Sequence, residues 1–464
     1  MDNLRSLPDI TPLGTTETTN SPWSTVIRAC LPAIRLVCVF VLPWAIPFTA
    51  TAQSGQRARD LGVPFDGTPG RNNGITDVPG VEVGVSTIIE GNGRLVVGKG
   101  PVRTGVTAIF PRGKNGSDSV FAGWFTLNGN GEMTGTTWVE ESGRLDGPIL
   151  ITNTHSVGVV RDATLAWMTK HRAGFLWALP LVAETYDGVL NDAEGFHVRR
   201  EHVFAALDGA RSGPVPEGNV GGGTGMQCHG FKGGTGTASR TLAGAAGGYT
   251  VGVLVQCNYG QRRRLTIAGL PVGREIPDLI RCAAGPTPPT RSWLMRIPVC
   301  GGSKITDTDL RKPELSGSET AHLTRKGVGR DEGLGSIIIV IATDAPLLPH
   351  QLKRVAKRAA LGVGRMGGLG EDSSGDIFIA FSTANTRASA DTGIVALTML
   401  PNDRINPIFE AAVGATEEAI TNAMLAAKTM TGADNIRSYA LPHDRLRAIA
   451  RKYATQQPLS GPIR

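Results

Sequence analysis

A run of five β-branched residues, Ile337 to Ile341, sets the first condition on how this chain folds. Ser336 precedes the run, Ala342 extends it, and no polar residue interrupts it. A strand with one face in water alternates polar and apolar side chains, whereas a continuous apolar run is typical of a strand covered on both faces. The sequence therefore predicts a buried strand over 337–342.

The pair in front of this strand, Gly335–Ser336, has a chemical interpretation as well as a structural one. A glycine leaves the peptide bond unhindered and tolerates backbone angles that other residues avoid. If the protein cuts this bond itself, Ser336 becomes an N-terminus that carries a nucleophile and a base in one residue. Its α-amine, with a pKa of about 7.7–8.0, can take the proton of its own hydroxyl near neutral pH. The alternative is an ordinary junction between a loop and a strand.

The remaining elements suggest two sheets with helices outside them. Runs rich in Val, Ile, Phe and Thr are bounded by Gly, Asn or Pro, and other segments repeat apolar residues at helical spacing. Strands are expected at 81–89, 102–110, 120–127, 149–152, 179–185, 249–257, 265–267 and 376–382, and helices at 162–171, 349–361 and 407–430. A glycine-rich bend is expected at 362–370, and a single apolar stripe on the last helix. The predicted class is α/β (α+β), a four-layer αββα sandwich.

The first 52 residues have the pattern of a secretory signal. Arg28 and Arg35 precede an apolar stretch, Leu36 to Phe48, and residues 50–52 (Ala-Thr-Ala) offer a small-residue cleavage site. The apolar stretch is short for a membrane span. We therefore expect a signal peptide at 1–52, a periplasmic or secreted protein, and no membrane attachment once the signal is removed. An uncleaved anchor is the alternative.

Four of the six cysteines lie beyond this leader. Cys282 and Cys300 flank a proline-rich stretch, and in an oxidising compartment a disulfide between them would close it. Cys228 and Cys257 are expected to be small buried residues, and the alternative is that they take part in other disulfide pairings. No cysteine or histidine has the spacing of a zinc site, so the sequence predicts no metal.

Charge and glycine content give no sign of a nucleic acid or a nucleotide. The formal net charge is +7, and the densest basic run, Arg262 to Arg264, has no interleaved aromatic residues, so a nucleic-acid partner is not expected. The glycine-rich segments 219–226 and 231–236 lack both the GxxxxGK[ST] pattern and a G-x-G-x-x-G that joins a strand to a helix. We interpret them as close backbone packing near a site, and expect no cofactor.

Two groups of polar residues beside predicted strands are candidates to assist Ser336. Ser374 and Asp376 are two apart at the start of a strand, so both point to one face, where they can orient an α-amine and relay its proton. Asn258 follows an apolar strand and can aim its amide at a developing oxyanion. Turn residues are the structural alternative in both cases.

A third group, Glu184 and Tyr186, lies at the end of the strand predicted at 179–185. Two residues apart, they share one face of the strand. A carboxylate and a phenol placed in this way can line a pocket and bind an ammonium group. A turn or surface role is the alternative.

Together these residues make the chain resemble the family of L-aminopeptidase/D-esterases and β-peptidyl aminopeptidases, which are N-terminal-serine hydrolases. The resemblance extends from about Gly62 to Tyr439. It is densest in four places: Asn128-Gly-Asn-Gly-Glu-Met-Thr-Gly135, Ile151-Thr-Asn-Thr-His-Ser-Val-Gly158, the glycine stretch from Gly221, and Gly335 to Asp344 with the Pro-His-Gln-Leu that begins at Pro349.

The resemblance implies a precursor that is cut between Gly335 and Ser336, an Ntn-hydrolase-like αββα sandwich similar to that of ornithine acetyltransferases, and a homo-oligomer of two-chain protomers. The large chain would then be 53–335 and the small chain 336–464, within one domain. The implied substrates are short peptides, amino-acid amides and esters with a free N-terminal amine. The implied roles are Ser336 as nucleophile, Ser374 and Asp376 as its orienting pair, Asn258 as oxyanion donor, Tyr186 as active-site tyrosine and Glu184 as the acid near the substrate amine.

Two departures from the family pattern affect these expectations. The stretch between Asn258 and Ser336 is longer than in relatives, so it can cap the pocket or alter assembly. Position 376 is Asp, where some β-peptide-cleaving members have Glu, which favours α-aminopeptidase over β-peptidyl aminopeptidase activity.

Two other functions are the alternatives. An acyltransferase of the ornithine-acetyltransferase type would use threonine in place of Ser336, and an uncut secreted binding protein is the non-enzymatic alternative.

Overall fold

The predicted central strand, β12 (Gly335–Thr343), lies in the middle of a six-stranded sheet of the computed structural model. Residues 56–116, 118–172, 175–285, 289–291, 297–301, 335–387 and 393–454 are described. The predicted leader, 1–52, lies outside them. The strand order is β4 (Arg144–Leu145), β3 (Val120–Thr126), β13 (Ser374–Ser382), β12, β10 (Thr250–Asn258) and β9 (Gly234–Thr241).

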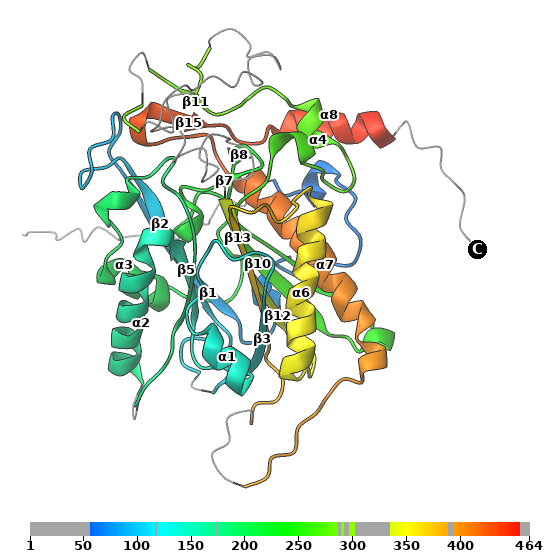
Figure 1. Ribbon diagram of the computed structural model, residues 1–464. Coiled ribbons are helices and arrows are strands. Elements are labelled where there is room, and N and C mark those ends of the chain that lie inside the picture. Colours follow the sequence, from blue (N-terminus) through cyan, green and yellow to red (C-terminus); the bar gives the residue numbers. More distant parts are fainter. Residues whose placement is uncertain are drawn as a thin grey trace, which may run out of the picture. The chain divides into compact units, whose positions relative to one another are not determined.

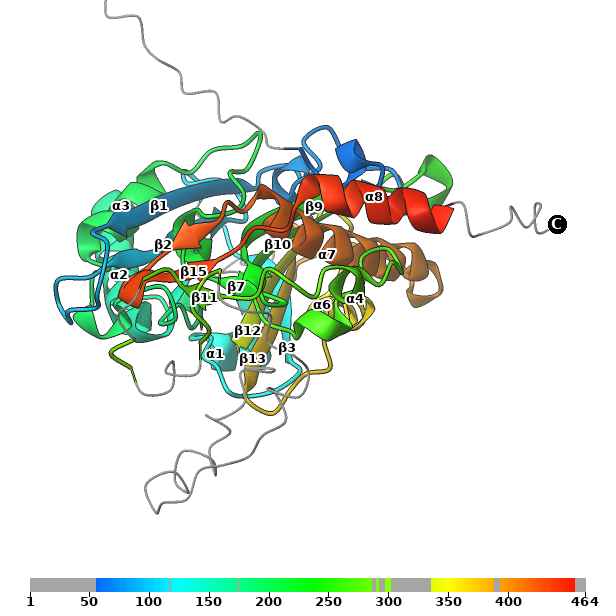
Figure 2. The same cartoon turned by 90° about the horizontal axis from the view of Figure 1, so that it is seen from above.

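The second sheet contains four strands in the order β1, β2, β5, β6. Their bounds are Glu82–Glu90, Val102–Phe110, Ile149–Asn153 and Leu181–Thr185. The helices α2 (Val157–His171) and α3 (Arg200–Asp208) cover its outer face, while α6 (Pro349–Arg365) and α7 (Asn406–Ala426) cover the outer face of the six-stranded sheet (Figure 1). Seen from above, the same four layers follow one another (Figure 2). The predicted αββα sandwich is confirmed.

The apolar run of β12 is buried on both faces, as predicted. Ile337, Ile339 and Ile341 belong to the core beneath α6 and α7. Ile338 and Val340 belong to the core between the two sheets, where they meet residues such as Ile151 of β5 and Leu181 of β6. Alternate side chains of a strand point to opposite faces, so one run supplies two cores. This is why β12 has no polar position except at its start and end.

Smaller elements complete the chain around these layers. Three short strands, β11 (Cys282–Ala283), β15 (Ile436–Ser438) and β14 (Met430–Thr431), form a sheet at the top of Figure 1, next to α8 (His443–Ala454) and α4 (Val272–Glu275). A hairpin of β7 (Gln227–Cys228) and β8 (Phe231–Lys232) lies beneath it, and α1 (Thr136–Ser142) follows β3.

Three element predictions were wrong. The segment 265–267 is no strand, because it follows a 3₁₀ turn at Arg262–Arg264 and Ile267 pairs only with Leu270. Helix α6 continues through Gly362 to Arg365, since α7 packs so closely there that a Cβ at Gly362 would lie 2.7 Å from Thr416. Helix α7 ends at Ala426 and is buried on nearly all sides, not along one stripe, because β9, β10 and α6 all pack against it.

The cysteine predictions had mixed outcomes. Cys282 and Cys300 form the predicted disulfide, with their Cα atoms 5.0 Å apart. The expectation that Cys228 and Cys257 are only small buried residues was wrong, because they form a second disulfide between β7 and β10, with Cα atoms 5.6 Å apart. The sequence could not show this pairing because it depends on how the β7–β8 hairpin lies against β10.

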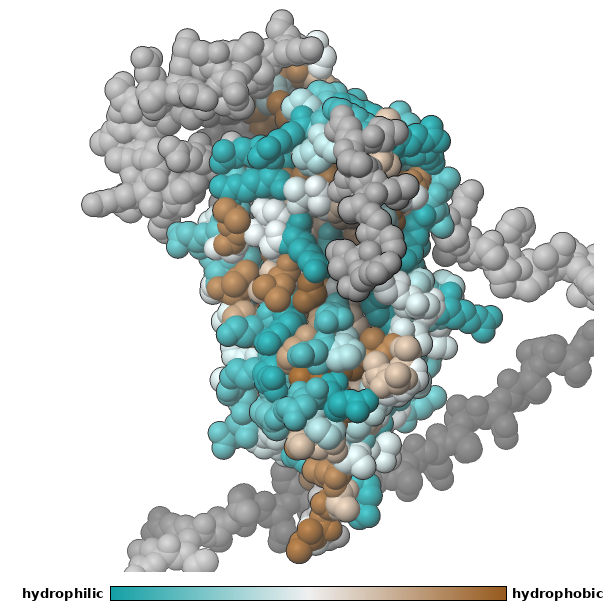
Figure 3. Space-filling view, turned by 90° about the vertical axis from the view of Figure 1, so that its right-hand side faces the viewer, coloured by the Kyte–Doolittle hydropathy of each residue, from teal (hydrophilic) through white to brown (hydrophobic). Residues whose placement is uncertain are grey.

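The surface seen from the right-hand side of Figure 1 mixes polar and apolar side chains in small groups (Figure 3). Such scattering is ordinary for a folded chain, whose surface always retains apolar atoms. Within the described ranges, no helix combines the length and the apolar character that crossing a bilayer requires.

Candidate active site

Ser336 occupies the second position of β12, where the central sheet begins, and its side chain is nearly buried. It pairs with Asn258 of β10 on one side and with Gly375 of β13 on the other. Gly335 before it has a φ of 149°, and a Cβ there would lie 1.9 Å from the carbonyl oxygen of Asn258. Only glycine fits this position, as the sequence analysis anticipated.

The parallel register of β13 places Ser374 and Asp376 on either side of the residue that pairs with Ser336. The amide of Gly375 between them donates to Ser336 Oγ at 3.1 Å. Ser374 Oγ donates to Asp376 Oδ1 at 2.6 Å. Burial raises the pKa of Asp376 to about 6, against the opposing effect of its hydrogen bonds with Ser374 and Asn128. The structure therefore places the predicted serine–acid pair on the strand next to the nucleophile candidate.

Asn258 of β10 pairs directly with Ser336 of the neighbouring strand β12, and both polar atoms of its side-chain amide are hydrogen-bonded. Its Oδ1 accepts from the backbone amide of Gln227 at 2.8 Å, and its Nδ2 donates to the carbonyl of Tyr186 at 2.9 Å. An amide nitrogen has two hydrogens. The Tyr186 carbonyl uses one, so the second remains for another acceptor.

Glu184, the fourth residue of β6, is buried and already has two hydrogen-bond donors. Thr154 Oγ1 donates to its Oε2, and the backbone amide of Glu132 donates to its Oε1 at 3.0 Å. A Cβ at Gly131 would lie 3.2 Å from Glu184 Oε1 and 2.9 Å from Gly375 Cα, so only this glycine separates Glu184 from the strand beside Ser336. Burial raises the pKa of Glu184, and the hydrogen bond from Thr154 opposes that rise.

The phenol of Tyr186 is not hydrogen-bonded to the other predicted site residues that the structure describes. Its side chain is 37% exposed and folds over Gly188, where a Cβ would lie 2.2 Å from the phenol oxygen. Its ring centroid is 6.1 Å from that of His155. Among the described residues no hydrogen bond links the phenol to Ser336 or Asn258. It is instead the backbone carbonyl of Tyr186 that takes part in the site.

Sequence reasoning missed Asn128, which follows the end of β3. Its Oδ1 accepts from the amide of Asp376 at 2.6 Å and its Nδ2 donates to Asp376 Oδ2 at 3.2 Å. It therefore fixes both the backbone and the carboxylate of the acid. The residue lies in the first dense segment of the family resemblance, which was the only available signal, since no spacing rule connects position 128 with 376.

The glycine-rich stretch serves close packing, as predicted. At Gly222 a Cβ would lie 2.1 Å from Oε1 of Gln256, and at Gly236 it would lie 2.2 Å from the carbonyl of Ala419 in α7. These contacts bring the backbone against β10 and α7. Across the described ranges, no cluster of three or more His, Cys, Asp or Glu residues is arranged to hold a metal.

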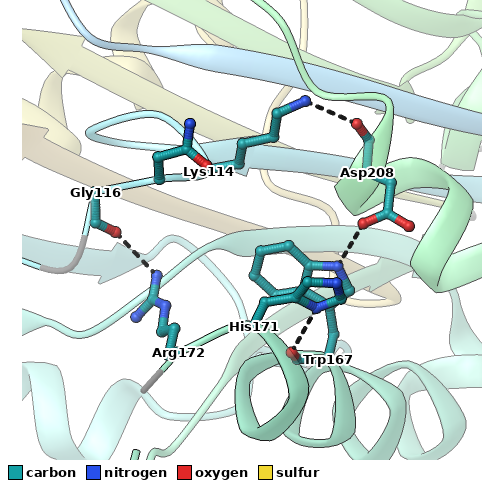
Figure 4. Close-up of a pocket in the computed structure, with 7 residues that line it drawn as sticks. Lys114, Gly116, Trp167, His171, Arg172 and Asp208 are labelled. Carbon is teal, nitrogen blue, oxygen red and sulfur yellow. Dashed lines mark hydrogen bonds between the residues drawn. The ribbon is translucent and has the colours of Figure 1, made fainter. Parts of the chain in front are cut away.

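A separate cavity of about 560 Å³ lies at the C-terminal end of α2 (Figure 4). Lys114, His171, Arg172 and Asp208 are among its lining residues. Lys114 donates to the carbonyl of Asp208 and Arg172 to that of Gly116, so these cations bind the protein's own backbone. None of the predicted site residues lines this cavity, and we place no chemistry there.

The αββα layers and the serine at the start of a central strand place this chain in the class of Ntn-hydrolase-type folds. A structure titled as the L-aminopeptidase D-Ala-esterase/amidase from Ochrobactrum anthropi, described there as a variant of the Ntn hydrolase fold, matches with a TM-score of 0.71 and 44% identity over 86% of this chain and 99% of that one. The Burkholderia sp. β-aminopeptidase matches with a TM-score of 0.69 and 44% identity, over the same shares.

Sequence comparisons identify the family to which the chain belongs. The model of Peptidase family S58 matches residues 73–438. The β-peptidyl aminopeptidase BapA of Sphingosinicella microcystinivorans is 55% identical over 405 residues, which are 87% of this chain and 94% of the relative. The chain belongs to Peptidase family S58 and is an aminopeptidase of that family.

Proposed function

We propose that this protein is an N-terminal-serine aminopeptidase that activates itself by cutting the Gly335–Ser336 bond. The observation that carries the proposal is the arrangement around Ser336, with Asn258 on one neighbouring strand and the Ser374–Asp376 pair on the other. In self-cleavage, Ser336 Oγ attacks the carbonyl carbon of Gly335 and the acyl group moves from nitrogen to oxygen. This shift breaks the C–N bond and frees the Ser336 amine, and water then hydrolyses the ester, which releases the Gly335 carboxylate and restores the Ser336 hydroxyl.

In catalysis, the freed α-amine takes the proton of Ser336 Oγ as the oxygen attacks the substrate carbonyl. The second hydrogen on Asn258 Nδ2 stabilises the oxyanion, and Ser374 with Asp376 orients the α-amine. The amine's proton passes to the leaving group, and water hydrolyses the acyl-enzyme. Glu184 binds the substrate's ammonium group, so the substrates are short peptides, amino-acid amides and esters with a free N-terminal amine.

We also propose export to the periplasm or outside the cell. Support comes from the signal-like pattern of residues 1–52 and from the two disulfides, because disulfides persist mainly in oxidising compartments.

Denaturing electrophoresis of the purified protein tests self-cleavage. We expect two bands, about 30 kDa for 53–335 and about 14 kDa for 336–464 by proportion of length. Ser336→Ala should remain one chain. The matched control is Ser382→Ala, which alters a buried serine at the far end of β13 and should still be cut. A wild-type protein that stays uncut and inactive, or an alanine variant cut at 335–336, would refute the mechanism.

A preference for β-peptides is the second candidate, and the names of the similar proteins favour it. Position 376 favours the α-peptide alternative on the family pattern. Comparing kcat/KM for α- and β-amino acyl p-nitroanilides with the same side chain separates the two. A higher value for the β-compounds establishes the second candidate, and a higher value for the α-compounds rejects it.

A further inference from the structure

Lys232 of β8 is a buried cation that the mechanism above does not use. Its side chain has no exposed surface. Its Nζ donates to the carbonyl oxygens of Met226 and Gly233 at 2.8 Å each, and to that of Gly223 at 3.5 Å. No ion pair joins it to a carboxylate in the part of the chain that the structure describes. Burying an ammonium group without a paired carboxylate is costly, so its presence calls for a function.

The carbonyl of Met226 belongs to the same peptide unit as the amide of Gln227. Lys232 Nζ donates to the carbonyl oxygen of this unit at 2.8 Å. The N–H of the same unit, which is that of Gln227, donates to Asn258 Oδ1 at 2.8 Å. A peptide unit is planar, so fixing the direction of its C=O also fixes the direction of its N–H. The ammonium therefore helps to fix the direction of the N–H that binds Asn258 Oδ1.

The same contact affects the electrostatics of the site. A cation bound to a carbonyl polarises the peptide unit and strengthens the hydrogen bond that its N–H donates. Burial lowers the pKa of Lys232 to about 7, while the carboxylate of Asp187, next to Tyr186, acts in the opposite direction. When protonated, Lys232 makes the electrostatic potential at the amide of Asn258 more positive, which favours a negatively charged oxygen bound to Nδ2.

We propose that Lys232 is a positioning residue for the oxyanion donor, acting through the Met226–Gln227 peptide unit on Asn258. The inference rests on the proposed function, because it assumes that Asn258 Nδ2 binds the oxyanion. A purely structural alternative is that Lys232 closes the 223–233 loop. In that case its loss would lower stability without a specific effect on the transition state.

A double-mutant cycle on the full, processed protein separates the two interpretations. Lys232→Met keeps the length and removes the charge and the donor. We expect kcat for alanine p-nitroanilide to fall on the order of ten- to a hundredfold with little change in KM, and less than for Asn258→Ala, which loses the donor itself. In the Asn258→Ala background, Lys232→Met should change kcat by less than about twofold, because the residue through which it acts is gone.

A second readout uses binding. An alanine-derived aldehyde forms a tetrahedral adduct with an oxyanion, whereas alaninol is a ground-state competitor with a free amine. Lys232→Met should weaken aldehyde inhibition by about the same factor as kcat/KM and leave alaninol inhibition unchanged. Arg240→Met is the control for removal of a buried cation: Arg240 of β9 pairs with Glu418 at 2.8 Å and has no contact with Asn258, so Tm should fall while kcat stays.

Additive effects in the cycle, or equal weakening of aldehyde and alaninol, would overturn the proposal. Lys232→Gln, which keeps a neutral donor, is measured in the same way in case the methionine variant does not fold. Failure of both to fold would show that the ammonium serves the fold and would also reject the assignment. If the wild type itself does not hydrolyse the anilide, or Asn258→Ala is fully active, the proposed function fails first and independently.

Discussion

At the scale of single residues, the sequence pattern predicted which strand carries a side chain and which face it shares, but not which distant residue it contacts. Ser374 and Asp376 were predicted together because residues two apart on a strand share a face, and they do bond to each other at 2.6 Å. Asn128, which binds Asp376, was not predicted, since it is 248 residues away in sequence. Contacts between distant segments follow from sheet order, which local periodicity does not encode.

The pH dependence of activity follows from two groups at the site. The α-amine must be neutral to accept a proton, so activity falls as pH falls through about 7.7–8.0. If the ionised form of Asp376 is needed to accept from Ser374, a second loss begins as pH falls through about 6, its raised pKa. We therefore expect log kcat/KM to fall by up to about one unit per pH unit between pH 8 and 6, less where protonation of Lys232, with its pKa of about 7, acts in the opposite direction, and with a slope of about two below pH 6.

The control for this profile is Asp376→Asn, which should lower kcat/KM at pH 8 and remove the steeper limb. A wild-type profile that keeps a slope of one down to pH 5 would show that Asp376 does not titrate in the catalytic cycle. A profile flat to pH 5 would mean that the α-amine is not the base.

Recognition of the substrate amine is tested at Glu184. A partly desolvated ammonium–carboxylate hydrogen bond contributes about 1.5–3 kcal/mol. Glu184→Gln should therefore lower kcat/KM for alanine p-nitroanilide on the order of ten- to a hundredfold. Self-cleavage should survive, because the precursor presents no ammonium group at this point. Thr154 and the amide of Glu132 hold this carboxylate in place through hydrogen bonds. Thr154→Val should therefore also lower kcat/KM for alanine p-nitroanilide, by a smaller factor than Glu184→Gln.

N-Acetylalanine p-nitroanilide is the matched substrate control. It should be a poor substrate for the wild type and for Glu184→Gln alike. Equal hydrolysis of the acetylated and free compounds by the wild type would mean that Glu184 does not anchor an amine.

At the scale of elements, long apolar segments were predictable and short or glycine-rich ones were not. The strand β12 and the helix α7 were recognised from apolar runs and spacing. The strand β9, with the sequence Gly-Thr-Gly-Thr-Ala-Ser-Arg-Thr, was missed, because its small residues serve the close approach of α7 and carry little apolar signal. Helix α8 was missed as well, since only Leu446 and Ile449 on it are buried.

The Cys282–Cys300 disulfide closes the segment that carries Arg291. Arg291 bonds to Asp434 at 3.2 Å, and its guanidinium also donates to the carbonyls of Gly188 and Val189, just beyond Tyr186. Replacing both cysteines by serine should lower the free energy of unfolding by about 3 kcal/mol on the loop-entropy model. Because the segment holds the chain after Tyr186, KM should rise as well.

Urea unfolding and steady-state kinetics of the double-serine variant check this, with peptide mapping under non-reducing conditions to verify the bridge in the wild type. Arg291→Ala separates the two effects: it should raise KM with a smaller loss of stability. An unchanged KM in both variants would show that the segment between Cys282 and Cys300 has no part in the site.

At the scale of the whole molecule, the two predicted chains are interleaved within one sheet. Residues 53–335 supply β4 and β3 at one edge and β10 and β9 at the other, while residues 336–464 supply the central strands β13 and β12. Each central strand is hydrogen-bonded to a strand of the other chain, β13 to β3 and β12 to β10. Cleavage at 335–336 cuts the chain at the start of β12 and breaks none of these ladders.

This interleaving predicts that the cut protein stays together until it unfolds. In native buffer the two fragments should elute as one species at the same volume as uncut Ser336→Ala, because separating them would expose both faces of β12 and break two strand ladders. After denaturation and dilution, Ser336→Ala should regain its folded protomer even at low concentration, whereas recovery of the folded protomer from the cut protein should fall as the concentration falls, since its two pieces must first meet. Gel filtration before and after refolding, with electrophoresis of the fractions, makes the comparison. Fragments that separate in native buffer would show that the small chain does not supply the centre of the sheet.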